Sequence, residues 1–298
     1  MSSNGQSDYR HLGAAARELA DSTNEERIHF IRTAKWIHYP RVESVLSRLG
    51  AMIAHPESTR MPCLLVYGDS GIGKTMLIDK FLRDHPAAFD QGAGVEHRPV
   101  LSMEMPSSPD DKRFYMELLR AIESPIASEM GVARLENLAL TLIPAVKPRL
   151  IIIDEVHNLL AGTPREQRRA LNTLKSVTNR LKICIAALGT AESLHAMQSD
   201  EQIASRFEPF HLPRWKSGRE FISFISTYVK MLPLRKPSDL ASDRSLGLLV
   251  ARSHGITGRI ATILQRAAEL AIIEAKESID YASIEKVSQH LCLPDNKS

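Results

Sequence analysis

Apolar residues in this chain are clustered in short continuous runs that alternate with stretches of helical spacing. Three runs, Cys63–Tyr67, Leu150–Asp154 and Ile183–Leu188, each contain at least four successive apolar residues. Continuous runs of this length are typical of strands that are buried on both faces, as in a parallel sheet. Two further segments, Pro99–Met103 and Phe207–Leu212, bring the number of predicted strands to five.

Between these strands, apolar residues recur every three or four positions, which is the spacing of amphipathic helices. The predicted helices cover residues 42–53, 75–82, 112–122 and 166–181. Strands that alternate with helices favour a parallel sheet covered on both faces. The pattern therefore predicts an α/β fold, with a five-stranded parallel sheet between helices.

The pattern becomes all-helical after Trp215. Ser217 and Glu220 match the Ser-x-x-Glu capping box, which predicts that a helix begins there. Two more helices are predicted at residues 257–276 and 283–291. This tail indicates a small C-terminal helical lid that follows the α/β fold.

These changes of pattern predict three domains. Residues 1–34 form an N-terminal arm, and its first 24 residues are rich in Ser, Asn, Gly and Ala. We expect a mobile segment or weak helix there, which could dock a partner. Residues 35–214 form the α/β domain, and residues 215–298 form the lid. A chain of 298 residues has room for one sizeable domain and a smaller companion.

Composition narrows the class of protein without indicating a function. The contents of 43% hydrophobic and 24% charged residues are ordinary for a globular protein, and a net charge of +3 is too small to indicate nucleic-acid binding. No apolar run is long enough to cross a membrane, and the first residues lack the order of an export signal. Cys63, Cys184 and Cys292 are far apart, which argues against a disulfide framework or a metal site. We therefore expect a cytoplasmic protein with no membrane partner.

A glycine-rich loop between the first predicted strand and the next helix carries the strongest chemical signal. It matches every fixed position of the phosphate-binding pattern G-x-x-x-x-G-K-[ST]. The loop consists of Gly68, Asp69, Ser70, Gly71, Ile72, Gly73, Lys74 and Thr75. Backbone N–H groups of such a loop, together with the start of the following helix, bind the phosphates of a nucleotide. Lys74 would reach the β- and γ-phosphates, and the Thr75 hydroxyl would bind Mg²⁺.

Two acidic residues follow the predicted strand at residues 150–153. Asp154 can hold the Mg²⁺ shell directly or through water. Glu155 is one residue further along, so it points another way and can polarise the water that attacks the γ-phosphate. The loop and the acid pair together predict a hydrolytic nucleoside triphosphatase.

Residues after the acid pair resemble motifs of the AAA+ ATPases, and this resemblance covers about residues 35–298. Thr190 follows the fourth predicted strand and resembles the sensor-1 residue, which helps to place water near the γ-phosphate. Arg206 resembles the arginine finger, and Arg259 resembles the sensor-2 arginine of the lid. The resemblance implies ATP and Mg²⁺ as cofactors, and ATP hydrolysis at interfaces between subunits, because a finger arginine reaches the γ-phosphate of a neighbour.

Several segments resemble more narrowly the transposition ATPases of the TniB/TnsC group, which includes the B protein of Mu-type phages. The segments are Trp36–Arg41, Arg60–Pro62, Gly68–Ser70, Asp154–Leu160 and Leu188–Glu192, and together they look most like TniB. The resemblance implies a homo-oligomer, either a ring or a helical filament, that binds double-stranded DNA when loaded with ATP. It also implies that the oligomer recruits or activates a DDE-type transposase, with a TniQ-like targeting protein as a further partner. Hydrolysis would then drive disassembly.

DNA contact of this kind requires basic groups that face phosphates along one surface. Lys112 and Arg113 begin the helix after the second predicted strand, and Arg165 and Arg168 begin the helix after the third. In AAA+ rings these two regions tend to line the central pore, so these four residues are the DNA-binding candidates. A solvated helix face is the alternative interpretation.

Other functions share the nucleotide motifs. A helicase loader or another DNA-replication ATPase would contain the same loop, acids and arginines. A signalling triphosphatase that oligomerises without DNA is compatible with the modest net charge. A binding module with vestigial hydrolysis is less compatible, because Lys74, Thr75, Asp154 and Glu155 are all present.

Overall fold

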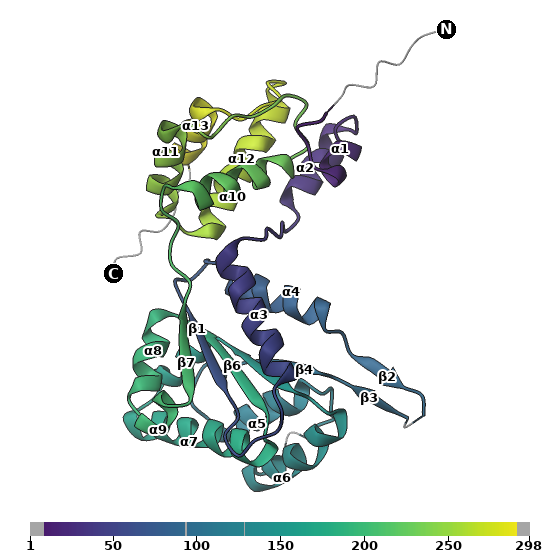
Figure 1. Ribbon diagram of the computed structural model, residues 1–298, viewed down its shortest axis with the longest axis vertical. Coiled ribbons are helices and arrows are strands. Elements are labelled where there is room, and N and C mark those ends of the chain that lie inside the picture. The colour runs from purple at the N-terminus through teal and green to yellow at the C-terminus, as the bar shows by residue number, and fades with distance from the viewer. Residues whose placement is uncertain (1–8, 93, 128, 291–298) are drawn as a thin grey trace. The chain divides into compact units, whose positions relative to one another are not determined.

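Five parallel strands form the central sheet of the protein in the computed structural model (Figure 1). In spatial order they are β4 (Val100–Glu104), β5 (Leu150–Asp154), β6 (Cys184–Gly189), β1 (Cys63–Tyr67) and β7 (Phe207–His211). Every neighbouring pair is parallel. All five strands therefore begin at one edge of the sheet, the amino edge, and end at the opposite one, the carboxyl edge. The predicted five-stranded parallel α/β fold is confirmed.

The structure describes residues 9–92, 94–127 and 129–290. The chain divides into two compact units: residues 40–213 form the sheet unit, and the segments before residue 40 and after residue 213 form the helical unit.

Helices cover the sheet because the strands are apolar on both faces. The helices of the sheet unit are α3 (Pro40–Ala54), α4 (Lys74–Asp84), α5 (Asp111–Arg120), α6 (Val132–Leu142), α7 (Pro164–Leu181), α8 (Ala191–Gln198) and α9 (Glu201–Ala204). Alternate strand residues such as Leu65 and Ile153 point to one face, where they join a core with Phe114 of α5 and Leu174 of α7. Helix α3 contacts β5 and β6, and the Cys184 thiol donates to Met52 O of α3 at 3.3 Å.

Two short 3₁₀ helices and one hairpin complete the sheet unit. The helices are η1 (Ile143–Val146) and η2 (Val156–Ala161), and the hairpin pairs β2 (Ala88–Asp90) with β3 (Val95–His97) in antiparallel register. The sequence patterns did not predict the hairpin or α6. Each hairpin strand has only three residues, too few to show a period of two.

The helical unit combines the two ends of the chain. Its helices are α1 (Ala14–Glu18), α2 (Asn24–Arg32), α10 (Arg219–Lys230), α11 (Asp243–Ser253), α12 (Thr257–Ile273) and α13 (Tyr281–His290). Ile31 of α2 belongs to the same apolar core as Phe221 of α10 and Ile260 of α12. No helix in the described ranges is long and apolar enough to cross a membrane.

Arg27 connects the N-terminal segment to the C-terminal helices. Its side chain is fully buried, and its Nε and Nη2 donate to Pro233 O at 2.9 and 2.7 Å. Nη1 donates to Glu277 Oε1 at 2.9 Å, and Nη2 also contacts the other oxygen of that carboxylate. Helix α2 therefore packs as part of the helical unit. A role of residues 1–34 in docking a partner stays a prediction.

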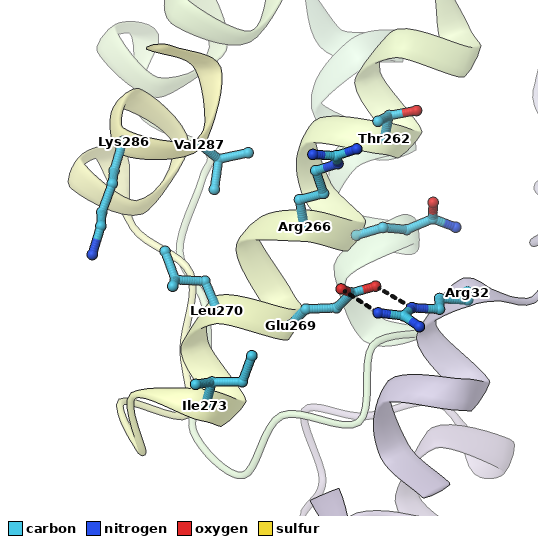
Figure 2. A pocket seen from close by; sticks show the side chains of 9 residues that line it. Arg32, Thr262, Arg266, Glu269, Leu270, Ile273, Lys286 and Val287 are labelled. Atoms are coloured by element: carbon cyan, nitrogen blue, oxygen red, sulfur yellow. Dashed lines mark hydrogen bonds and ion pairs between the residues drawn. The ribbon is translucent and has the colours of Figure 1, made fainter. Parts of the chain in front are cut away.

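A surface groove of about 780 Å³ lies between α2, α12 and α13 of the helical unit (Figure 2). Leu270, Ile273 and Val287 form part of its apolar wall. On its α2 side, Arg32 Nε and Nη2 donate to the two carboxylate oxygens of Glu269 at 2.9 and 3.0 Å (Figure 2). The Arg32 side chain is 66% exposed, in contrast to the buried Arg27 on the same helix.

Two helix boundaries in this unit differ from prediction. Helix α10 is capped by Gly218 without a side-chain hydrogen bond, so the predicted capping box of Ser217 and Glu220 is wrong. Helix α12 ends at Ile273 because Ala275 adopts a positive φ of 55°, which terminates the helix before the predicted position 276. The predicted end of the last helix at Leu291, and Cys292, lie outside the described residues.

Candidate nucleotide-binding site

The phosphate loop connects the carboxyl end of β1 to α4. Gly71 and Gly73 have positive φ values of 76° and 107°, a conformation that glycine adopts without strain. A Cβ atom on Gly68 would lie 2.5 Å from Leu212 O, so only glycine fits there. Because α4 begins at Lys74, the free N–H groups of its first turn lie next to the loop. The loop therefore has the backbone geometry of an anion-binding site.

Lys74 is the buried cation of this loop, with 7% of its surface exposed. Its Nζ donates to Gly68 O at 2.9 Å and to Asp69 O at 3.0 Å. Burial lowers the pKa of the ammonium group, and the carboxylates of Glu155, Asp154 and Asp69 oppose that shift. A phosphate beside Nζ would supply the negative charge that this ammonium group needs, so the residues fit a nucleotide.

Thr75 and Asp154 meet although their strands are not neighbours. Strands β1 and β5 are separated by β6, but both end at the carboxyl edge. Thr75 Oγ1 donates to Asp154 Oδ2 at 3.0 Å, and Asp154 Oδ1 accepts from the backbone N–H of Glu155 at 2.8 Å. A hydroxyl and one carboxylate are the protein ligands expected for Mg²⁺ that is bound chiefly through phosphates and water.

The described residues include no group of three or more His, Cys, Asp or Glu side chains that could hold a metal ion by itself. The oxygen atoms of Thr75 and Asp154 fit a metal that arrives with the nucleotide.

Glu155 stands at the turn between β5 and η2. Its backbone adopts the left-handed conformation, with φ 52° and ψ 36°, which is uncommon for a residue with a side chain. A Glu155 carboxylate oxygen lies 3.0 Å from Nδ1 of His157 without the alignment of a hydrogen bond. Glu155 is thus a second carboxylate next to the loop that takes no part in the Thr75–Asp154 contact.

Thr190 follows β6 at the same carboxyl edge. The backbone N–H of Gly68 donates to Gly189 O at 3.1 Å, so the residue before Thr190 is bonded to the phosphate loop. The Thr190 hydroxyl is buried, and it makes no hydrogen bond to any described residue. A buried hydroxyl in this state is suited to bind a water molecule or a phosphate oxygen.

Sequence reasoning missed Gly189. A Cβ atom there would lie 2.1 Å from the hydroxyl oxygen of Ser193 and 2.9 Å from a methyl group of Val156. Only glycine allows β6 to pass this close to η2 and α8. The signal was present in the sequence as a glycine at the end of a predicted buried strand.

Arg206 lies at the opposite edge of the sheet. It directly precedes β7, and Phe207 pairs with Cys63 at the start of β1. A five-residue strand rises about 17 Å, so the length of β1 separates Arg206 from the phosphate loop of its own chain. Arg206 Nη1 donates to Asn179 Oδ1 of α7 at 2.7 Å. The structure therefore does not bring Arg206 together with Lys74 and Glu155 within one protomer.

Comparison with known proteins assigns the chain to a family. A family model described as "Bacterial TniB protein" matches residues 27–217, which is well over half of the chain. The chain belongs to the bacterial TniB protein family. No curated protein matches the sequence.

Solved structures share the fold of this TniB-family chain. The Aeropyrum pernix ORC2 protein, in its ADPNP-ADP complexes, has 18% identity and a TM-score of 0.63, over 88% of this chain and 71% of that chain. Cdc6p of Pyrobaculum aerophilum has 13% identity and a TM-score of 0.63, over 89% and 70%. The Aeropyrum pernix ORC1 protein in complex with DNA has 16% identity and a TM-score of 0.60, over 89% and 69%. The sheet and its flanking helices thus have the AAA+ fold.

The remaining nucleotide candidate of the TniB-family chain, Arg259, lies in the helical unit. It is the third residue of α12 and is half-buried. Its assignment as the lid arginine that contacts nucleotide stays a prediction.

The four DNA-binding candidates of the TniB-family chain lie on two helices that contact each other. Lys112 and Arg113 are in the first turn of α5, and Arg165 and Arg168 are near the start of α7. Between them, Arg169 of α7 forms an ion pair of 2.5 Å with Asp111 of α5. Thr173 Oγ1 donates to the other Asp111 oxygen at 2.8 Å.

Both helices begin at the carboxyl edge, because each follows a parallel strand there. The side chains of Arg113, Arg165 and Arg168 are exposed. The structure thus gathers the four candidates at one end of the sheet unit, although contact with DNA stays a prediction.

Proposed function

We propose that this TniB-family protein is an ATPase that regulates DNA transposition. In this proposal it assembles on duplex target DNA in its ATP-bound state and recruits or activates a DDE-type transposase. The observation that carries the proposal is the convergence of Lys74, Thr75, Asp154 and Glu155 at one sheet edge, in a chain that belongs to the TniB family.

Each of these side chains has a part that its geometry supports. Lys74 binds the β- and γ-phosphates and neutralises charge as the terminal bond breaks. Thr75 and Asp154 would hold Mg²⁺, which would supply electrostatic stabilisation of the phosphates when bound. Glu155 accepts the proton of the attacking water, because its carboxylate is not engaged by Thr75.

Arg206 adds a requirement for assembly. Because it lies at the amino edge of its own sheet, we infer that it completes the nucleotide site of another protomer in the assembly. A guanidinium group supplied in this way stabilises the transition-state charge of phosphoryl transfer. Hydrolysis would remove the γ-phosphate that Arg206 contacts, so the assembly loosens after turnover.

The basic starts of α5 and α7 support DNA as the surface on which assembly occurs. Exposed arginines at the end of one unit are suited to phosphate contacts, which provide affinity without base recognition. A transposase and a TniQ-like targeting protein are the partners proposed for the DNA-bound oligomer, since TniB-family membership relates the chain to transposition.

Steady-state ATP hydrolysis, measured with and without duplex DNA, tests the proposal. We expect DNA to raise the rate, and to raise it more steeply as protein concentration increases, because neighbouring protomers complete each site. Co-purification of the DNA-bound, ATP-loaded protein with a transposase encoded beside it tests the transposition role. A rate that is independent of both DNA and protein concentration would contradict the proposal.

A further inference from the structure

The amino edge of the sheet carries a basic residue before every strand. These residues are Arg60 before β1, Arg98 before β4, Arg149 before β5, Lys182 before β6 and Arg206 before β7. A basic side chain therefore stands at the start of each of these five strands, at the edge remote from the phosphate loop of the same chain.

The arginines at this edge differ in their partners. Arg98 forms ion pairs with Glu96 and Glu123, at 2.6 and 2.8 Å, so its charge is already balanced within the chain. In the described part of the chain, by contrast, Arg60 and Arg206 contact only neutral acceptors. Both guanidinium groups thus keep their charge available for an anion from outside the protomer.

Arg60 is bonded directly to the turn that carries Arg206. Its Nη2 donates to Ser205 O at 2.5 Å and to Ser205 Oγ at 2.8 Å. The parallel register of β1 and β7 explains this contact, since it aligns the residues before Cys63 with those before Phe207.

The backbone near Arg60 is itself fixed. Ser58 Oγ donates to Arg60 O at 2.9 Å, and Met61 is buried. On the other side of the contact, the backbone N–H of Ser205 donates to Glu201 O at 3.0 Å. Burial raises the pKa of the Cys63 thiol, at the start of β1, to about 12, and the positive charges of Arg206 and Arg60 both oppose this rise.

We propose that Arg60 is a positioning residue for Arg206, and that the two arginines form a paired surface that receives the nucleotide phosphates held by a second copy of this chain. This inference rests on the proposed function. Arg60 would hold the Ser205–Arg206 turn in place and keep a second positive charge beside the finger. The complementary partner is the phosphate loop, where Lys74 and the start of α4 hold the triphosphate of the adjacent protomer.

Substitution of Arg60 tests this pairing through assembly and through nucleotide binding. With a non-hydrolysable ATP analogue and duplex DNA, we expect Arg60→Ala to raise the protein concentration needed for assembly roughly 10-fold or more, as measured by light scattering. Binding of a fluorescent ATP analogue to dilute protomers should not change, because the loop lies at the other edge. Ser205→Ala removes only the hydroxyl acceptor and should give a smaller loss.

Arg48→Ala is the matched control. Arg48 is a partly exposed arginine that contacts Glu208 of β7, so its charge is already balanced by a carboxylate. We expect wild-type assembly for this variant. An Arg60→Ala protein that assembles and hydrolyses ATP like the Arg48→Ala protein would overturn the inference.

Mixed assemblies separate this inference from the proposed function. Arg60→Ala protomers have an intact loop, whereas Lys74→Ala protomers have an intact amino edge, so a mixture of the two should regain ATP turnover. A mixture of Arg206→Ala and Lys74→Ala should behave in the same way. If only the Arg206 mixture recovers activity, the role of Arg60 is wrong. If neither mixture recovers and the wild type does not assemble with ATP, the proposed function itself fails.

Discussion

Lys74 combines deep burial with a positive charge, and among the described residues backbone carbonyls and nearby carboxylates stabilise that charge. A bound triphosphate would add the interaction that this residue is placed to make.

We therefore expect Lys74→Ala to weaken nucleotide binding at least 100-fold and to abolish ATP-dependent assembly. Titration with a fluorescent ATP analogue measures the first effect, and sedimentation measures the second. Lys80→Ala, on the same helix, is the control, because Lys80 forms its ion pair with Asp84 at the far end of α4. Equal affinities in the two variants would show that the loop does not bind nucleotide through Lys74.

Glu155 offers a second test at this scale. Glu155→Gln keeps the size of the side chain but removes its ability to accept a proton, so we expect ATP hydrolysis to fall about 10²- to 10⁴-fold. Binding should persist, and ATP-loaded oligomers should therefore accumulate on DNA, which gel-shift and electron microscopy would detect. The exposed Glu192→Gln variant provides the control. Normal hydrolysis by Glu155→Gln would assign the water-polarising role to another group.

The sequence could predict the grouping of Lys74, Thr75 and Asp154 because local spacing determines it. The loop pattern fixes two of these residues relative to one strand, and a parallel sheet brings strand ends to one edge. The sequence could not predict the contact of Arg60 with Ser205, because that contact depends on the order of strands in the sheet, with β7 next to β1. The catalytic and binding roles of all these residues stay predictions.

At the scale of elements, α2 carries two arginines, one in a buried ion pair and one in an exposed ion pair. Arg27 is buried and bonded to Pro233 O and Glu277, whereas Arg32 is exposed and bonded to Glu269. We expect Arg27→Ala to lower the free energy of unfolding of the helical unit by about 3–5 kcal/mol, because the buried Glu277 carboxylate would lose its nearest cation and keep the longer contact with Arg235, at 3.7 Å. Arg32→Ala should cost less than about 1 kcal/mol. Thermal and urea unfolding of the two variants provide the comparison, and similar losses would contradict the assigned role of Arg27.

Helices α5 and α7 carry the prediction about DNA. Charge reversal by Lys112→Glu together with Arg165→Glu should weaken duplex binding and reduce the slope of log affinity against log salt by about 2, one contact for each residue. Fluorescence anisotropy at several salt concentrations measures both quantities. The control is Arg83→Glu with Lys147→Glu, which makes the same change in net charge on exposed residues elsewhere on the sheet unit. An equal effect of both pairs would indicate that only net charge matters.

The elements that the sequence predicted well are those with strong local patterns. The strands β1 and β5 match their apolar runs residue for residue, because continuous runs bounded by loop residues leave little choice of ends. The capping box at Ser217 failed because the helix begins one residue later than the box requires, with Gly218 as its N-cap and no side-chain cap. Helix α11 was also missed.

At the scale of the whole molecule, the N-terminal segment is the part whose structure differs most from what its composition predicts. Small and polar residues predicted a mobile arm or weak helix, yet the described residues 9–39 contribute to the helical unit through α1 and α2. The decisive contacts join Arg27 to Pro233 and Glu277, more than 200 positions away, and no local pattern contains that information.

Deletion of residues 1–34 should therefore destabilise the C-terminal helices. It removes Arg27 and exposes the core that Ile31 helps to fill, so we expect a lower melting temperature and a loss of soluble protein. Deletion of residues 1–8 is the control, since it leaves Arg27 and Ile31 in place. If the longer deletion unfolds at the wild-type temperature, the segment is a removable arm.

The insertion of the sheet unit between the two halves of the helical unit also sets an order of events during synthesis. The chain of residues 40–213 is complete when the ribosome has reached little more than two thirds of the message. Glu277 lies 250 positions after Arg27, so it is synthesised about 12–50 s later at ordinary rates of translation. Throughout that interval Ile31 of α2 has no core to join, because the rest of that core comes from residues after position 213 and from Ile37.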